Sequence, residues 1–130
     1  MTPARSAGVS FAELRRIALR QPEVTEGRYY GRPSFFVGGR FFAGYRADID
    51  VLVATIGFED RDFLVRAKPS VYFITDHYLN YPTVLVSLAT ASRAEVEAAV
   101  GAAREFALSK PAPKRRGRAG RRSTRPRRSR

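Results

Sequence analysis

The sequence predicts an α+β domain in two layers, with a five-stranded antiparallel sheet covered by helices on one face. Near both ends of the chain, after Ser10 and after Ser92, apolar residues recur at the three- and four-residue steps of a helix. Between these segments, short apolar runs alternate with Gly, Pro and Asp. Gly38-Gly39 joins two aromatic-rich runs, which indicates a tight hairpin. The expected order of elements is α-β-β-β-α-β-β-α.

The helices are predicted from their first turns. Residues 10–13 and 92–95 both read Ser-x-x-Glu, a capping box in which the hydroxyl accepts from a backbone amide and the carboxylate reaches back. The first helix should end before Pro22, and the last should run to about Leu108. A short helix is expected over 59–66, with its carboxylates in the favourable N-terminal turn.

The strands are predicted from β-branched and aromatic runs. Residues 23–33 contain Gly27, Gly31 and Pro33 and are interpreted as a loop, with room for a short strand near 28–30. The five strands are expected at about 34–37, 40–46, 51–56, 70–75 and 83–88.

A two-residue turn at Gly38-Gly39 fixes which side chains share a sheet face. One face would carry Phe36, Phe41, Ala43 and Tyr45, and we interpret it as the core face. The other face would hold a surface patch of aromatic rings fringed by guanidinium groups, formed by Phe35, Arg40, Phe42 and Arg46. Such a patch is typical of a ligand, nucleic-acid or subunit contact, including a homodimer. Alternatively, the tail or a loop covers it, or the register differs.

The composition limits the classes of function. The 130 residues suffice for one domain with a modest core. Cysteine is absent and His77 is the only histidine, so thiolate chemistry is excluded and a His-based metal site is not expected. No Ser-His-Asp pattern or phosphate-binding glycine loop is evident. We therefore expect a non-enzymatic protein without cofactor, metal or catalytic residues. The lack of a long apolar run predicts no membrane association and a cytoplasmic location.

The positive charge is concentrated at the C-terminus. Residues 110–130 hold eleven Lys and Arg side chains and no acid, whereas residues 1–109 hold 13 basic and 12 acidic side chains. The chain therefore divides into a nearly neutral domain, 1–109, and a basic tail, 110–130. The tail lacks Leu, Ile, Val, Phe and Tyr, so we expect it to be disordered when free.

The tail is the predicted nucleic-acid-binding segment, because eleven cations without an acid attract polyanions. Arg116-Gly117-Arg118 is similar to the centre of minor-groove-binding AT-hook peptides. A solubilising role for the tail is the alternative. The predicted binding residues are Lys114, Arg115, Arg116, Arg118, Arg121, Arg122, Arg125, Arg127 and Arg128.

Two smaller features of the domain leave alternatives open. Tyr29 and Tyr30 stand between Arg28 and Arg32, where the rings could stack on bases or could close the edge of the core. His77 could take part in acid–base chemistry, but local hydrogen bonding is the simpler interpretation.

Three stretches together resemble the MmcQ/YjbR family of small bacterial proteins. They are residues 21–27 (QPEVTEG), 30–35 (YGRPSF) and 37–43 (VGGRFFA), and the resemblance extends from about Ser10 to Leu108. It implies the two-layer fold called double-wing or CyaY-like, related in shape to type III secretion chaperones. The family is often labelled DNA-binding, and the resemblance implies no catalytic signature.

These observations favour a protein that associates with nucleic acid, with DNA as the expected polymer and weak sequence preference. The basic tail would supply the attraction, and the exposed sheet face could assist. The alternative is a protein-interaction or small-ligand module that works through the aromatic sheet face, with the tail incidental.

Overall fold

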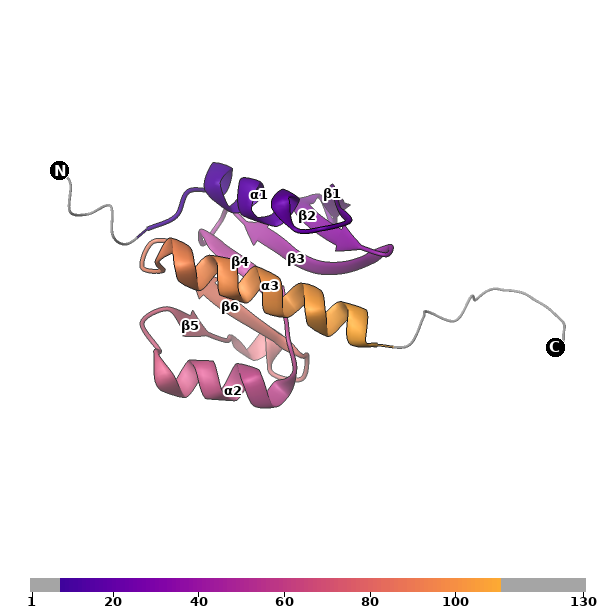
Figure 1. Ribbon diagram of the computed structural model, residues 1–130. Helices are drawn as coiled ribbons and strands as arrows, with labels where there is room; N and C mark the ends of the chain where they lie inside the picture. Colours follow the sequence, from indigo (N-terminus) through magenta and orange to yellow (C-terminus); the bar gives the residue numbers. More distant parts are fainter. Residues whose placement is uncertain (1–7, 111–130) are drawn as a thin grey trace, which may run out of the picture.

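Six strands, each antiparallel to its neighbours, form one sheet in the order β1-β2-β3-β4-β6-β5. The computed structural model describes residues 8–110 (Figure 1). The predicted α+β class and antiparallel sheet are confirmed, but the predicted number of five strands is wrong. The elements are α1 (Phe11–Arg20), β1 (Val24–Tyr29), β2 (Arg32–Val37), β3 (Arg40–Arg46), β4 (Val51–Thr55), α2 (Phe58–Ala67), β5 (Tyr72–Phe73), the 3-10 helix η2 (Asp76–Tyr78), β6 (Thr83–Ser87) and α3 (Arg93–Ser109).

The additional strand is β1, which replaces the predicted loop. It pairs with β2 from Val24–Val37 to Tyr29–Arg32. Tyr30 and Gly31 join the two strands with φ of 54° and 76°, the two positive values of a type I′ turn. A tyrosine rarely adopts positive φ, so the sequence gives little sign of this turn. The order of elements becomes α-β-β-β-β-α-β-β-α, with η2 between the last two strands.

α1 and α3 cover the same face of the sheet, and their side chains meet those of the sheet in one apolar core (Figure 1). Both predicted capping boxes form: the hydroxyls of Ser10 and Ser92 each accept from the amide three residues on, at 3.1 Å. α2 lies beside β5 and β6 and adds two partly buried residues to this core. Fully buried core residues include Leu14, Ala18, Phe35, Phe42, Leu52, Val86, Val96 and Val100.

The β2–β3 hairpin has the predicted turn but contains a β-bulge. Gly38 and Gly39 have φ of 58° and 78°, and Phe36 pairs with Phe41 as predicted. Beyond that pair the register shifts, because Phe35 pairs with Ala43. Phe42 is therefore an extra residue in β3, and the strict alternation of side chains is interrupted there.

The predicted core and surface faces of this hairpin are wrong for its four phenylalanines, but Ala43 and Tyr45 contribute to the core as predicted. Phe35 and Phe42 are fully buried beneath the helices, whereas Phe36 and Phe41 are half-buried on the opposite face. The bulge is the physical reason on β3, because it lets Phe42 and Ala43 both contribute to the core under the helices. A strictly alternating strand would place these neighbours on opposite faces.

We predict that Gly39→Val destabilises the protein by about 1–3 kcal/mol, because a β-branched residue at positive φ strains the backbone. Gly101→Ala is the matched control: Gly101 lies inside α3, and a Cβ there meets no atom within 4 Å. This control should stabilise the protein by about 0.5–1 kcal/mol. Urea unfolding measures both changes, and equal midpoints for wild type and Gly39→Val would contradict the turn geometry.

Candidate functional site

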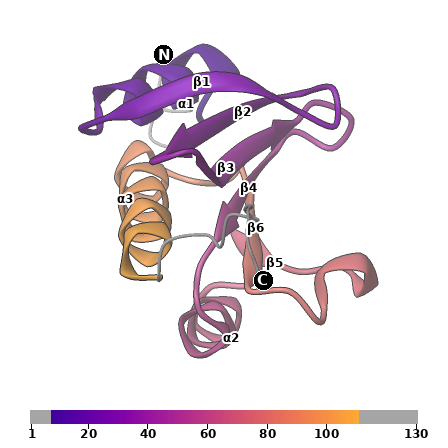
Figure 2. The same ribbon diagram turned by 90° about the vertical axis from the view of Figure 1, so that its right-hand side faces the viewer.

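A cleft of about 620 Å³ lies on the sheet face opposite α1 and α3, and we call it the open-face cleft. Three segments line it: the turn of the β1–β2 hairpin, the middle of β3 and β4, and the connection between β5 and β6. Figure 2 shows α3 on one side of the sheet and this connection projecting on the other. The aromatic side chains that line the cleft are Tyr29, Tyr30, Phe41, Tyr45, His77, Tyr78 and Tyr81.

The floor of the cleft is a small apolar cluster separate from the main core. Val51, Val53 and Leu85 are its buried members, and Phe41 packs against them. The Phe41 ring lies over Gly44, where an added Cβ would stand 3.1 Å from Phe41 Cε1. Because that distance is shorter than normal contact, only glycine at position 44 admits the ring without displacement.

The hairpin wall of the cleft is made of tyrosines. The Tyr29 ring stacks on Phe41, with centroids 5.0 Å apart, and Tyr30 meets Tyr29 edge-on at 4.6 Å. Their exposed fractions are 47% and 86%. The neighbouring Tyr30 phenol, followed by burial, raises the pKa of Tyr29, so its hydroxyl is a neutral donor at physiological pH. Neither ring belongs to the core beneath the helices; Tyr29 instead covers the edge of the smaller cluster through Phe41, and Tyr30 lies outside it.

The opposite wall is held by Arg61 of α2, a residue that the sequence does not distinguish from a surface arginine. Its side chain is almost completely buried, with 5% of the residue exposed. One guanidinium nitrogen donates to the carbonyl oxygens of Leu79 (3.0 Å) and Tyr81 (3.1 Å). The guanidinium also lies 4.9 Å from the centre of the Phe58 ring. Arg61 therefore anchors the segment that carries Tyr78 and Tyr81.

Two arginines supply positive charge to the cleft. Arg46 forms a two-pronged ion pair with Asp48, with nitrogen–oxygen distances of 3.2 and 2.5 Å. Hydrogen bonds to Asp48 and then Tyr78 raise the pKa of Arg46, and the same pair lowers the pKa of Asp48. The positive charge of Arg32 also lowers the pKa of Asp48, so the two arginines share one carboxylate. The pair therefore leaves positive charge in excess at the cleft.

The predicted surface patch does not exist as such. Phe35 and Phe42 are buried, and Arg40 extends along the helix face, where it donates to the carbonyl oxygens of Ala107 (2.5 Å) and Lys110 (2.9 Å). The Ala107 carbonyl also accepts from the Lys110 amide at 3.4 Å, so the arginine adds a side-chain donor to the C-terminal end of the helix. Of the four predicted residues, only Arg46 lines the cleft.

The remaining predicted site residues have separate outcomes. His77 lies at the cleft rim, with its ring edge-on to Tyr78 at 4.8 Å. Glu59 and Asp60 are exposed in the first turn of α2, where the sequence predicts the carboxylates of this helix. The nine predicted tail cations lie outside the described residues 8–110.

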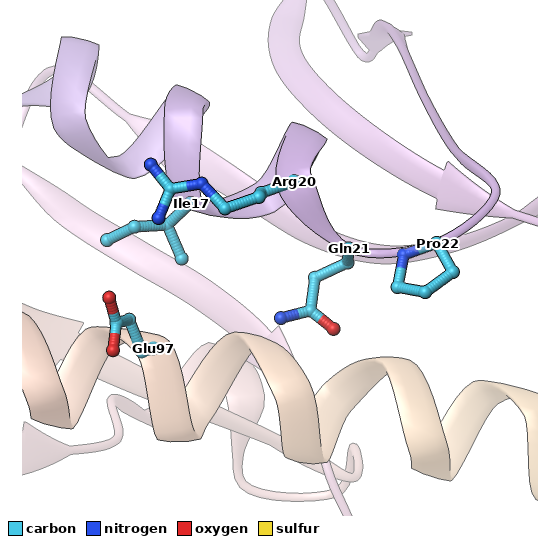
Figure 3. Close-up of a pocket in the computed structure, with 5 residues that line it drawn as sticks. All are labelled: Ile17, Arg20, Gln21, Pro22 and Glu97. Carbon is cyan, nitrogen blue, oxygen red and sulfur yellow. The ribbon is translucent and has the colours of Figure 1, made fainter.

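A smaller hollow of about 290 Å³ lies between the end of α1 and α3 (Figure 3). Its lining contains no aromatic ring, and Gln21 directs its amide toward α3. The lining residues are Ile17, Arg20, Gln21, Pro22 and Glu97. The open-face cleft is larger and combines stacked rings with cations, so it is the better candidate site.

In the part of the chain that the structure describes, no helix is long and apolar enough to cross a membrane. Within the same residues, no cluster of three or more His, Asp or Glu side chains could hold a metal ion. The fold and cleft define an α+β protein with one helix-covered and one partly open sheet face. The chain matches no family model, no curated protein and no solved structure, so membership of the MmcQ/YjbR family stays a prediction.

We predict that Arg61→Ala destabilises the protein by about 1–3 kcal/mol, because part-buried carbonyls of the 78–81 segment lose their donor. Arg61→Lys should recover only part of this loss, since an ammonium cannot reproduce the planar guanidinium contacts. Arg66→Ala, on the exposed last turn of α2, is the matched control and should change stability by less than about 0.5 kcal/mol.

Urea unfolding gives the stability change, and amide hydrogen exchange locates it. Exchange should accelerate in residues 76–83 of Arg61→Ala before it accelerates in α1 or α3. Uniform acceleration across the domain would contradict an anchoring role for this arginine.

Proposed function

We propose that this protein is a non-enzymatic nucleic-acid-associating protein. The observation that carries the proposal is the separation of charge: eleven cations and no acid in residues 110–130, against 13 basic and 12 acidic side chains in residues 1–109. Electrostatic attraction to a polyanion must therefore come chiefly from the tail. DNA is the expected polymer, and the cytoplasm the expected location.

The chemistry of the tail supports weak sequence preference. Lys and Arg side chains gain affinity by releasing counterions from phosphates, which every sequence presents alike. The sequence of this segment contains no Leu, Ile, Val, Phe or Tyr, the side chains with which a core would fix guanidinium groups against base edges. The proposed contacts are made by Lys114, Arg115, Arg116, Arg118, Arg121, Arg122, Arg125, Arg127 and Arg128.

A second candidate function is a small-ligand or protein-interaction module, including self-association through the open face. The open-face cleft favours it, because a concave site of about 620 Å³ with aromatic walls falls in the range of small-molecule pockets. The two functions differ in where the affinity resides. Removal of the tail should abolish the first and spare the second.

We predict that the full chain binds duplex DNA with a steep salt dependence. If roughly six tail cations neutralise phosphates, log affinity falls against log salt with a slope of about −5. A chain ending at Lys110 keeps the carbonyl that Arg40 contacts, and it should lose most of this affinity. Fluorescence anisotropy with duplexes of different sequence measures both effects.

Equal affinity and equal salt slope for the full and shortened chains would contradict the tail's role. Circular dichroism of the shortened chain verifies that its domain is folded. Sedimentation of both chains without DNA tests self-association through the open face.

A further inference from the structure

Tyr30 stands at a position where its side chain contributes little to the fold. It occupies the first place of a type I′ turn, with φ of 54°, and 86% of the residue is exposed. Asn-Gly is the pair that suits such a turn, because asparagine tolerates positive φ better than other side chains. Folding alone therefore gains little from an exposed tyrosine there. Residues held in unfavourable backbone regions without a structural benefit occur at functional sites.

The ring of Tyr30 belongs to a set of aromatic surfaces that face a common space. On the hairpin side, Tyr29 stacks on Phe41 and meets Tyr30 edge-on. On the other side, Tyr81 lines the same cleft with 56% of the residue exposed. The cleft of about 620 Å³ between them presents flat, partly solvent-exposed aromatic rings on which a planar group of a ligand can stack.

The polar groups of the cleft suit an anion attached to that planar group. Arg32 and Arg46 both lie near Asp48, so two positive charges face one carboxylate in the lining. Thr83 adds a hydroxyl group, whereas the hydroxyls of Ser34 and Thr55 already donate to the carbonyl oxygens of Arg32 and Phe42. An aromatic heterocycle joined to a phosphate matches this combination of rings and cations.

We propose that the open-face cleft binds unpaired bases of a single-stranded nucleic acid. Bases inside a duplex are covered on both faces by their neighbours, so side-chain rings can stack only on bases that are unpaired. The twenty residues after Lys110 can span at most about 70 Å, so the tail can reach phosphates of a strand bound at the cleft. This inference rests on the proposed function and adds the form of nucleic acid that the folded domain selects.

The test compares two single strands of equal length, one normal and one abasic, bound to the full chain. Both carry the same phosphates, so their difference in affinity isolates base stacking from electrostatic attraction. We expect the normal strand to bind at least about fivefold tighter, in line with stacking of one or two bases. Tyr30→Asn and Tyr81→Asn should bring this ratio toward one and leave the affinity for the abasic strand unchanged.

Two controls separate binding from folding. Tyr30→Asn should unfold at an equal or higher urea concentration than wild type, because asparagine suits the turn. Phe63→Ala removes an aromatic residue that is 62% exposed on α2, outside the cleft, and should leave the ratio unchanged.

The inference is overturned if the wild-type protein binds the normal and the abasic strand with equal affinity. Tail-dependent binding of duplex DNA would still support the proposed function in that case. The inference is also overturned if Tyr30→Asn weakens both strands equally, since the tyrosine then serves phosphate contact. If a free nucleoside monophosphate binds as tightly as the normal single strand, the inference is overturned, because the cleft is then a small-ligand site. Absence of binding to either strand or to duplex would contradict the proposed function itself.

Discussion

The β-bulge at Phe42 is the constraint on which both faces of the sheet depend. Before it, Phe36 and Phe41 pair across the hairpin; after it, Phe35 pairs with Ala43. The inserted residue allows Phe42 and Ala43 both to contribute to the core beneath α1 and α3. It also leaves Phe41 and Gly44 together in the cleft lining, where the ring lies over the glycine. Without the bulge, strict alternation would place Phe41 and Ala43 on the same face of the sheet. Ala43 could then not pack in the core beneath the helices while Phe41 forms the floor of the cleft on the opposite face.

Two arginines connect separate elements through backbone carbonyls, and each therefore has a structural role that its charge does not reveal. Arg40 reaches from the start of β3 to the C-terminal end of α3, where it donates to the carbonyls of Ala107 and Lys110. Arg61 connects α2 to the 78–81 segment and thereby holds one wall of the cleft. The planar guanidinium presents several donors in fixed directions, which lets one side chain satisfy more than one carbonyl. Arg46 and Arg32, by contrast, keep their charge at the cleft.

Local signals made the helices and the central hairpin predictable. The Ser-x-x-Glu boxes at 10–13 and 92–95 act within a single turn, and Gly38-Gly39 specifies its own turn type. What could not be predicted depends on distant contacts or on unusual local chemistry. Tyr30 gives no sequence sign of positive φ, so the sequence predicts a loop over 23–33 with at most a short strand near 28–30, and not the full length of β1. The bulge at Phe42 is selected by packing on both faces of the sheet, and the role of Arg61 depends on a segment about twenty residues away. The open face does carry aromatic rings beside arginine, but its rings are Tyr29 and Phe41 rather than Phe35 and Phe42, and Arg46 is the one residue of the predicted patch that lines it.

The proposed tail and cleft contacts differ in physical origin, and salt therefore separates them. Attraction by the tail arises from counterion release and weakens steeply as salt rises, whereas stacking of a base on tyrosine depends on contact and loss of hydration and changes far less. At low salt any polyanion should be captured through the tail, with little regard to its form. At higher salt the difference made by unpaired bases should form a larger share of the remaining affinity. The near-neutral balance of residues 1–109 strengthens this separation, because most of the general attraction to phosphates is then expected from the tail and the selectivity for unpaired bases from the rings of the cleft.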